Sequence, residues 1–160
     1  MPSMINLPDN HREISNNEIT LEMSTELIRI ILVDDHKLVR ESLCLLLGYD
    51  PRFSIIMACD NGQDAILQAR TLHPDIMLVD VNMSPVNGFE VVKNVMATDP
   101  DTKIIGISVN NHPQYVEHML SIGARGFVTK GSPLEEMTNA IIAVYEGKQY
   151  VSGDILRLKE

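Results

Sequence analysis

Five side chains that could carry phosphoryl chemistry stand where apolar segments of the chain end: Asp34, Asp35, Asp80, Ser108 and Lys130. A carboxylate can attack phosphorus as a nucleophile, and carboxylate oxygens are the protein ligands that Mg²⁺ prefers. An ammonium and a hydroxyl can neutralise and hydrogen-bond the oxygens of a phosphate. This set of residue types therefore suits phosphoryl transfer if the fold brings its members together.

The segment before Asp80 indicates how one of these residues would be positioned. Residues 76–79 (Ile-Met-Leu-Val) form a continuous apolar run, which is typical of a parallel strand buried on both faces. Asp80 ends the run, and a turn-rich loop follows over residues 82–88. Open α/β sheets place their chemistry at the carboxyl ends of such strands. Taken alone, Asp80 could equally be a residue that only ends a strand, because aspartate is common in loops.

The chain alternates between five predicted strands and five predicted helices. The strands are residues 29–33, 53–58, 76–79, 103–109 and 126–129, and the helices are about residues 36–48, 61–72, 88–97, 113–122 and 132–147. This alternation predicts a parallel sheet with helices on both faces. The last helix has the strongest start signal, with Ser132 as N-cap, Pro133 as first helical residue and Glu135 completing a capping box.

The carboxyl ends of parallel strands share one edge of the sheet, so we expect the five polar side chains to converge there. Three carboxylates at one edge would repel one another unless positive charge offsets them. Lys130 and Mg²⁺ could provide that charge. For Asp34 and Asp35 alone, a solvated acidic loop would be the simpler interpretation. We expect His36 at the surface or behind the metal ligands, not bound to the metal.

Composition limits the classes of protein to which the chain can belong. Hydrophobic residues make up 44% of the chain, which is typical of a globular protein. The formal net charge of −9 argues against a nucleic-acid-binding surface, which needs a basic patch. Cys44 and Cys59 have no metal-binding spacing and suggest buried free thiols in a reducing, cytoplasmic compartment, with a disulfide as the less favoured alternative. No apolar run is long enough to cross a membrane.

The two ends of the chain differ from the middle. Residues 1–27 contain five acidic residues and one arginine, Arg12, and we expect a mostly disordered acidic extension there. A solvated tail is favoured over a partner-binding segment. Residues 149–160 are expected to form a C-terminal tail or the start of a linker, which leaves residues 28–148 as the domain.

Four motifs connect the chain to a known family. They are residues 31–36 (Ile-Leu-Val-Asp-Asp-His), the segment from Asp80 through Met83 to Gly88, Ile107-Ser108, and residues 126–130 (Gly-Phe-Val-Thr-Lys). Over residues 28–148 the chain thereby resembles the receiver domain of bacterial two-component response regulators, most of all the NarL/FixJ-type branch. The resemblance implies a flavodoxin-like, CheY-like doubly wound α/β fold with five parallel strands in the order 2-1-3-4-5 and five helices.

The resemblance also implies roles for the site residues. Asp80 would be phosphorylated by a histidine kinase or phosphotransfer protein in a Mg²⁺-dependent phosphorelay, which makes the chain a signalling domain and not a turnover enzyme. Asp35 and Asp80 would bind Mg²⁺ directly and Asp34 through water, and the backbone carbonyl of Asn82 would complete the protein ligands. Lys130 would pair with Asp80 or with its phosphate.

Ser108 and Phe127 fall on the switch positions of the family. Ser108 would reach the phosphate, and Phe127 would then move and change a face that binds a partner or a second copy. The chain also departs from the family pattern at three positions. Pro85 is displaced by one residue, which predicts altered loop geometry with a working site. Val109 is larger than the usual residue and could restrict access to the phosphate. Gly131 replaces a frequent proline, so no cis-proline is expected there.

Two other functions are weighed against the receiver. A Mg²⁺-dependent phosphatase with an aspartate nucleophile would want a second Asp at position 82, which is Asn82 here. A pseudo-receiver that only binds partners is disfavoured because every acidic and basic site position is filled. The branch usually continues into a helix-turn-helix domain, for which residues 151–160 are too short, so the sequence fits either a stand-alone receiver or the receiver half of a transcription factor. We expect no direct DNA binding by this chain.

Overall fold

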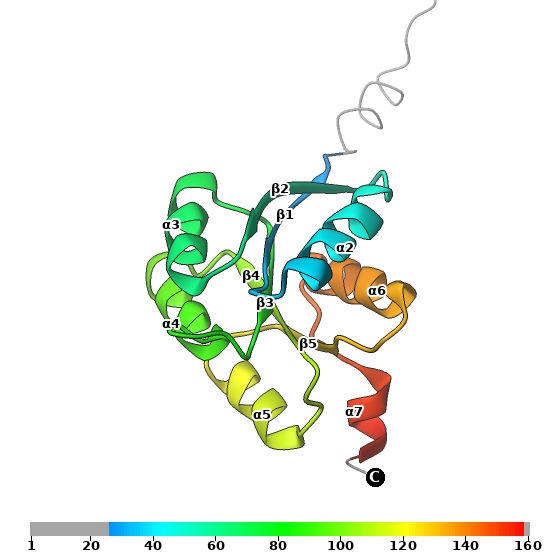
Figure 1. Cartoon of the computed structure of the whole chain (residues 1–160). Coiled ribbons are helices and arrows are strands. Elements are labelled where there is room, and N and C mark those ends of the chain that lie inside the picture. The colour runs from blue at the N-terminus through cyan, green and yellow to red at the C-terminus, as the bar shows by residue number, and fades with distance from the viewer. Residues whose placement is uncertain (1–25, 159–160) are drawn as a thin grey trace, which may run out of the picture.

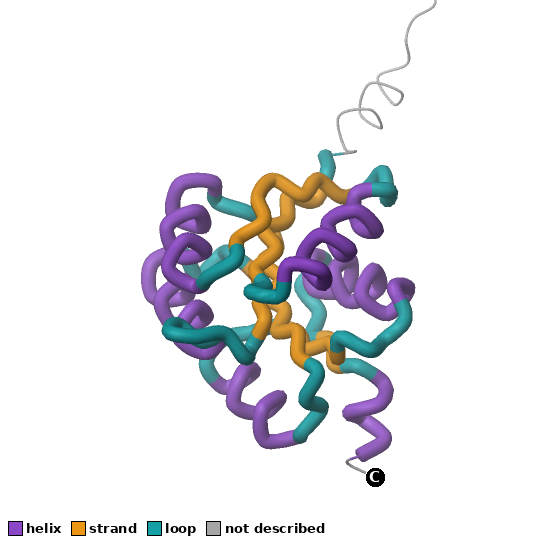
Figure 2. The backbone as a smooth tube through the Cα atoms, viewed as in Figure 1, coloured by secondary structure: helices purple, strands orange, loops and turns teal. Residues whose placement is uncertain are grey.

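The computed structural model describes the backbone of residues 26–158 and the side chains up to residue 155, so the expectation for residues 1–25 lies outside it. Six parallel strands form one sheet in the order β2-β1-β3-β4-β5-β6. The sheet runs through the centre of the molecule, between helices (Figures 1 and 2). The strands are β1 (Ile28–Val33), β2 (Phe53–Cys59), β3 (Ile76–Asp80), β4 (Lys103–Ser108), β5 (Gly126–Thr129) and β6 (Tyr150–Val151). The helices are α2 (Lys37–Gly48), α3 (Gly62–Leu72), α4 (Gly88–Thr98), α5 (Pro113–Ser121), α6 (Leu134–Tyr145) and α7 (Gly153–Leu158).

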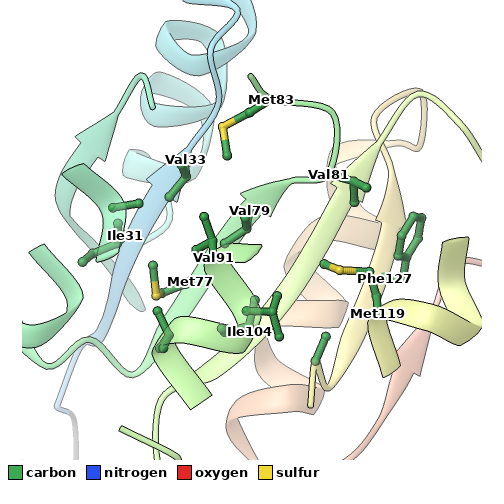
Figure 3. Close-up of a cluster of buried hydrophobic side chains, with 14 of the residues drawn as sticks. Ile31, Val33, Met77, Val79, Val81, Met83, Val91, Ile104, Met119 and Phe127 are labelled. Carbon is green, nitrogen blue, oxygen red and sulfur yellow. The ribbon is translucent and has the colours of Figure 1, made fainter. Parts of the chain in front are cut away.

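Helices cover both faces of the sheet, and alternate strand residues fill the two cores. Helices α3, α4 and α5 pack on one face, where Ile31, Met77 and Phe127 are buried (Figures 1 and 3). Helices α2 and α6 pack on the other face, where Leu32 and Leu78 are buried. Side chains of a strand point alternately to the two faces, so a strand covered on both sides must be apolar throughout. This requirement explains the unbroken apolar run that ends at the site.

The predicted doubly wound fold and the order of its five strands are confirmed. Strand ends differ from the prediction by at most one residue; β2, for example, extends to Cys59 and β4 stops at Ser108. The start of α4 is fixed by a capping box in which the Asn87 side chain accepts a hydrogen bond from the Glu90 N–H, while Glu90 accepts one from the Asn87 N–H. Two backbone donors at this helix end are therefore satisfied.

The predicted start of the last large helix is wrong in detail. Helix α6 begins at Leu134, and its N-cap is Pro133, which makes no side-chain capping bond. The Ser132 hydroxyl instead lies 2.7 Å from the Thr129 hydroxyl. A serine hydroxyl can serve a helix end or another nearby group, and here the strand end engages it.

Strand β6 and helix α7 were not predicted from the sequence, and they continue the domain past residue 149. Strand β6 pairs in parallel with β5, so that Tyr150 lies opposite Gly126 and Val151 opposite Phe127. The strand has two residues and no alternating pattern that could reveal it. By pairing with β5 it covers backbone groups that an edge strand would otherwise expose.

Hydrogen bonds and apolar packing hold the segment after β6 against β5. The Ser152 hydroxyl accepts a hydrogen bond from the Thr129 N–H at 3.0 Å, and the Ser152 N–H donates to the Phe127 carbonyl at 3.0 Å. The Thr129 hydroxyl donates to Asp154 Oδ2 at 3.0 Å. Ile155 is fully buried in the same hydrophobic cluster as Phe127. The segment is thus packed into the domain at the strand that ends beside the site.

Both cysteines are free, as predicted, although Cys44 is only half-buried. Burial raises the pKa of the Cys59 thiol to about 11, so this thiol stays protonated near neutral pH. Among residues 26–158, none of the helices combines the length and apolar character that a membrane crossing needs.

The Ser152 contacts predict a measurable contribution to stability. Ser152 is fully buried, so Ser152→Ala would leave the Thr129 N–H without its acceptor and should lower the free energy of unfolding by about 1–3 kcal/mol. Urea denaturation checks this, with the exposed Ser121→Ala as matched control. If the two variants were equally stable, the segment after β6 would not be anchored as described.

Candidate functional site

The site lies at the edge of the sheet where β1, β3, β4 and β5 end. Asp34 follows β1, Asp80 and Ser108 are the last residues of β3 and β4, and Lys130 follows β5. The side chains of Asp34, Asp80 and Ser108 are at most 1% exposed. All five side chains expected at this edge are brought to it, and three of them are buried there.

Lys130 joins the two buried carboxylates. Its Nζ lies 2.8 Å from Asp34 Oδ2 and 3.2 Å from Asp80 Oδ2, and its own side chain is 9% exposed. A backbone hydrogen bond from the Lys130 N–H to the Ser108 carbonyl, at 2.8 Å, fixes the start of this side chain beside β4. The pairing with Asp80 was expected, whereas the shorter contact with Asp34 was not. One ammonium therefore offsets two buried negative charges.

The charge of Asp80 is set by opposing influences. Burial raises the pKa of the Asp80 carboxyl, and the nearby Asp34 carboxylate adds to that effect. The Asn82 N–H, which donates to Asp80 Oδ1 at 3.1 Å, and the Lys130 ammonium lower the pKa. The net direction is upward. A further positive charge at this position would therefore stabilise the ionised form.

The loop after β3 returns closely over the end of the strand. The Gly88 N–H donates to the Val81 carbonyl at 3.0 Å, and a Cβ at Gly88 would lie 2.5 Å from the Asp80 carbonyl oxygen. Only glycine fits this approach. The loop contains a cis peptide bond between Ser84 and Pro85, and the residue after Lys130 forms no such bond.

Ser108 is held by two donors, one of them not anticipated. Its Oγ accepts hydrogen bonds from the Asn82 side-chain amide at 3.1 Å and from the Asn110 N–H at 3.0 Å. The expectation for Asn82 concerned only its backbone, so the contact of its side chain with Ser108 was missed. Phe127 is fully buried beside Met119 on the helix-α5 side of the sheet (Figure 3). Val109 is 77% exposed and points away from the core.

The His36 side chain is 63% exposed, in agreement with the expected surface position, but its ring also contacts the acidic cluster, which the sequence did not indicate. Its Nδ1 is 3.1 Å from Asp35 Oδ1, 3.2 Å from Asp34 Oδ1 and 3.7 Å from Asp80 Oδ2. Its backbone N–H also donates to Asp34 Oδ1 at 2.9 Å. The sequence feature that could have indicated this contact is that His36 directly follows two candidate metal ligands, Asp34 and Asp35. Arg40, also missed, donates to the Asp34 backbone carbonyl at 2.8 Å and brings a second cationic side chain near the cluster.

The donor set fits a divalent cation. One potential ligand atom from each of Asp34, Asp35, His36 and Asp80 can be chosen so that all four atoms lie within 4.8 Å of one another. Asp34 Oδ2 and Asp80 Oδ2 are buried and accept no well-aligned hydrogen bond, although Lys130 is within ion-pair distance of both. Buried carboxylate oxygens without such bonds are suited to a hard cation, and Lys130 alone leaves the cluster negative.

The fold and the site together define a class of protein. A doubly wound parallel sheet carries three carboxylates, a hydroxyl and a lysine at the ends of β1, β3, β4 and β5, which is the arrangement of a receiver-type signalling domain. Residues 30–142 match the family model described as the response regulator receiver domain. The chain belongs to this family, the receiver domain of two-component response regulators.

Individual relatives agree with this assignment. The response regulator GacA of Pseudomonas viridiflava is 34% identical over 129 residues, which are 81% of this chain and 60% of the relative. The response regulator UvrY of Escherichia coli K12 is 31% identical over 81% of this chain and 59% of the relative. The chain thus spans about 60% of the length of these curated relatives.

Solved structures point to the same branch. A LuxR-family two-component response regulator from Aurantimonas sp. SI85-9A1 is 28% identical with a TM-score of 0.80, covering 82% of this chain and 94% of that one. The signal receiver domain of the putative response regulator NarL from Mycobacterium tuberculosis is also 28% identical, with a TM-score of 0.74. The match covers 77% of this chain and 99% of that one. The predicted family and its NarL/FixJ-type branch are confirmed.

The double ion pair predicts the effect of removing Lys130. In EDTA, Lys130→Met would leave Asp34 and Asp80 buried without their shared cation, and the free energy of unfolding should fall by about 3 kcal/mol. The exposed Lys93→Met should change it by no more than about 0.5 kcal/mol. Urea denaturation of both variants provides the measurement. Equal stability of the two would show that Lys130 does not offset the buried charges.

Proposed function

We propose that this domain accepts a phosphoryl group on Asp80 from a histidine kinase or a phosphotransfer protein. The observation that carries the proposal is the state of the Asp80 carboxylate. It is 1% exposed, it has one oxygen without a well-aligned hydrogen bond, and that oxygen lies 3.2 Å from the Lys130 ammonium. A carboxylate with a free oxygen beside a fixed positive charge is suited to attack a negatively charged phosphoryl group.

The reaction exchanges one bond to phosphorus for another. The free oxygen of Asp80 attacks the phosphorus of a phosphohistidine on the partner, the new O–P bond forms, and the P–N bond breaks. The leaving imidazole takes up a proton and becomes neutral histidine, and Asp80 becomes an acyl phosphate. Most of the catalysis in such transfers comes from positioning and from neutralising the charge of the phosphoryl oxygens.

Residues of the chain are available to hold a cation that would contribute to this neutralisation. Asp35 and Asp80 are proposed as direct ligands of Mg²⁺, Asp34 as a ligand through water, and the backbone carbonyl of Asn82 as a further ligand. When bound, the cation supplies positive charge close to the phosphate oxygens. Asp35, whose side chain is 35% exposed, offers the most accessible carboxylate of the cluster to an entering ion.

Three groups of the chain can bind the phosphate after transfer. Lys130 already lies 3.2 Å from the reacting oxygen and can follow the new negative charge. The Ser108 hydroxyl accepts two hydrogen bonds, so its own proton remains available to donate to a phosphate oxygen. The Asn82 side-chain amide, now bonded to Ser108, is close enough to join that contact.

The proposed switch starts from the bonds that hold Ser108 and not from an exposed aromatic ring. Phe127 is already buried, so its exposure can only rise if β5 or its neighbours move. Ser108 holds the Asn110 N–H, and a rotation of its hydroxyl toward phosphate would release the loop that precedes α5. A change on α5 and β5 would then alter a surface for a second copy or another partner.

The phosphoacceptor assignment predicts the effect of Asp80→Asn. Acetyl phosphate should give acid-labile phosphate incorporation in the wild type with Mg²⁺, while Asp80→Asn should fall to background because the nucleophile is lost. The exposed Asp101→Asn, at the opposite end of the sheet, should be labelled like wild type. Undiminished labelling of Asp80→Asn would overturn the assignment, and full labelling in EDTA would remove the metal from the proposal.

The switch predicts a different response for Ser108→Ala. Beryllofluoride, which mimics a phosphoryl group on aspartate, should increase the sedimentation coefficient of the wild type if the changed face pairs two copies. Ser108→Ala lacks the hydroxyl that senses the group, so its coefficient should change little. Ser42→Ala, on helix α2 at the other face of the sheet, serves as the control and should respond like wild type. Equal shifts in the wild type and Ser108→Ala would refute Ser108 as the coupling residue.

A further inference from the structure

We propose that Asp154, on helix α7, is a positioning residue for Lys130 and acts through two neighbouring hydroxyl groups. The hydroxyls are those of Thr129 and Ser132, the residues on either side of the short loop that carries the lysine. The inference rests on the proposed phosphoacceptor function, because Lys130 is the group that would neutralise phosphoryl oxygens at Asp80. It assigns part of the arrangement of that site to a helix that lies outside the five predicted strands and their loops.

Lys130 lies in a tight turn that the same two residues close twice. The Ser132 N–H donates to the Thr129 carbonyl at 3.0 Å, which makes Lys130 and Gly131 the central residues of a four-residue β-turn. The hydroxyl oxygens of Thr129 and Ser132 lie 2.7 Å apart, so a second hydrogen bond spans the turn. The position of the Lys130 backbone therefore depends on both bonds.

Asp154 sets the direction of the hydrogen bond between the two hydroxyls. The Thr129 hydroxyl donates to Asp154 Oδ2 at 3.0 Å. A hydroxyl has one proton to donate, so Thr129 can only accept its second bond, and Ser132 must be the donor. A hydrogen bond to an ionised acceptor is stronger than a neutral one, and it polarises the next bond in the chain. The carboxylate thus strengthens the bond that closes the turn.

The Asp154 side chain makes no competing hydrogen bond among the described residues, and the backbone before it is held in place. Its other oxygen, Oδ1, is buried and has no hydrogen-bond partner in that part of the chain. The Gly153 N–H donates to Glu136 Oε1 at 2.6 Å, which ties the start of α7 to α6. The bonds of Ser152 tie the same segment to β5. An acceptor on a fixed backbone restrains the hydroxyl that it binds.

A movement of this turn would change the contacts of the ammonium group. Lys130 Nζ lies 2.8 Å from Asp34 Oδ2 and 3.2 Å from Asp80 Oδ2, so it bridges two carboxylates that belong to different strands. Small displacements of a charged group that neutralises the transferred phosphoryl can slow the reaction, since most of the catalysis comes from positioning. The hydroxyl chain therefore contributes to the rate without touching the reacting atoms.

Lysine footprinting in EDTA tests the positioning on the full chain, without any phosphorylation. The Lys130 side chain is 9% exposed, so reductive dimethylation should modify it slowly in the wild type. We expect Asp154→Ala to raise this rate by about threefold or more, relative to the exposed Lys93 in the same sample, because the turn opens more often. Asp154→Asn keeps an oxygen that can accept from Thr129 and should stay close to wild type. Mass spectrometry of the peptides measures the rates.

The initial rate of labelling by acetyl phosphate with Mg²⁺ gives the second readout. Asp154→Ala and Thr129→Val should each lower the rate by about three- to tenfold, whereas Thr129→Ser, which keeps the hydroxyl, should approach the wild type. Because the two residues act through one chain, the double variant should be no slower than the slower single variant. Far-UV circular dichroism establishes that each variant is folded under the assay conditions, and the two single substitutions test the same chain independently.

The exposed Asp101→Ala is the matched control and should behave like the wild type in both measurements. The positioning role is wrong if Asp154→Ala changes neither rate, if Asp154→Asn is as impaired as Asp154→Ala, or if the effects of Asp154→Ala and Thr129→Val multiply. If the wild type is not labelled while Lys130 modification still responds to Asp154→Ala, the proposed function fails and the positioning of the lysine stands. The two failures are therefore distinguishable.

Discussion

The structure of the site depends on one shared ion pair. Lys130 lies within 3.2 Å of oxygens from two carboxylates that are at most 1% exposed, and each carboxylate ends or follows a different central strand. Burying two like charges is costly unless positive charge compensates them. The strands β1, β3 and β5 must therefore end at one level for the ammonium to reach both. The apolar, doubly covered sheet imposes that alignment.

Strand β5 connects this site to the segment after residue 149. Lys130 follows the strand at the site, and Thr129, the residue before it, is bonded to Ser152 and Asp154. Phe127 on the same strand shares a hydrophobic cluster with Ile155. A displacement of Lys130 toward a phosphate would thus act on a strand to which the last described helix is attached.

The fold and most of the site could be predicted because burial and strand direction leave clear patterns in the sequence. Continuous apolar runs identified the central strands, and the crossover rule placed Asp34, Asp80, Ser108 and Lys130 at one edge. The missed features depend on tertiary contacts of single side chains. The sequence predicts Ser132 as an N-cap, but its hydroxyl contacts Thr129. Strand β6 has no pattern of its own, since its stability comes from pairing with β5. The ring of His36 contacts carboxylates that follow β1 and end β3, and this proximity arises only once the sheet brings the two strand ends together.

The central claim is that Asp80 carries the phosphoryl group, and chemical mapping of the modified residue tests it most directly. Borohydride reduces an aspartyl phosphate to homoserine, which mass spectrometry locates within a peptide. After treatment of the wild type with acetyl phosphate and Mg²⁺, homoserine should appear at position 80, while Asp34 and Asp35 should remain aspartate. Homoserine at position 34 or 35, or at none of the three positions, would contradict the account.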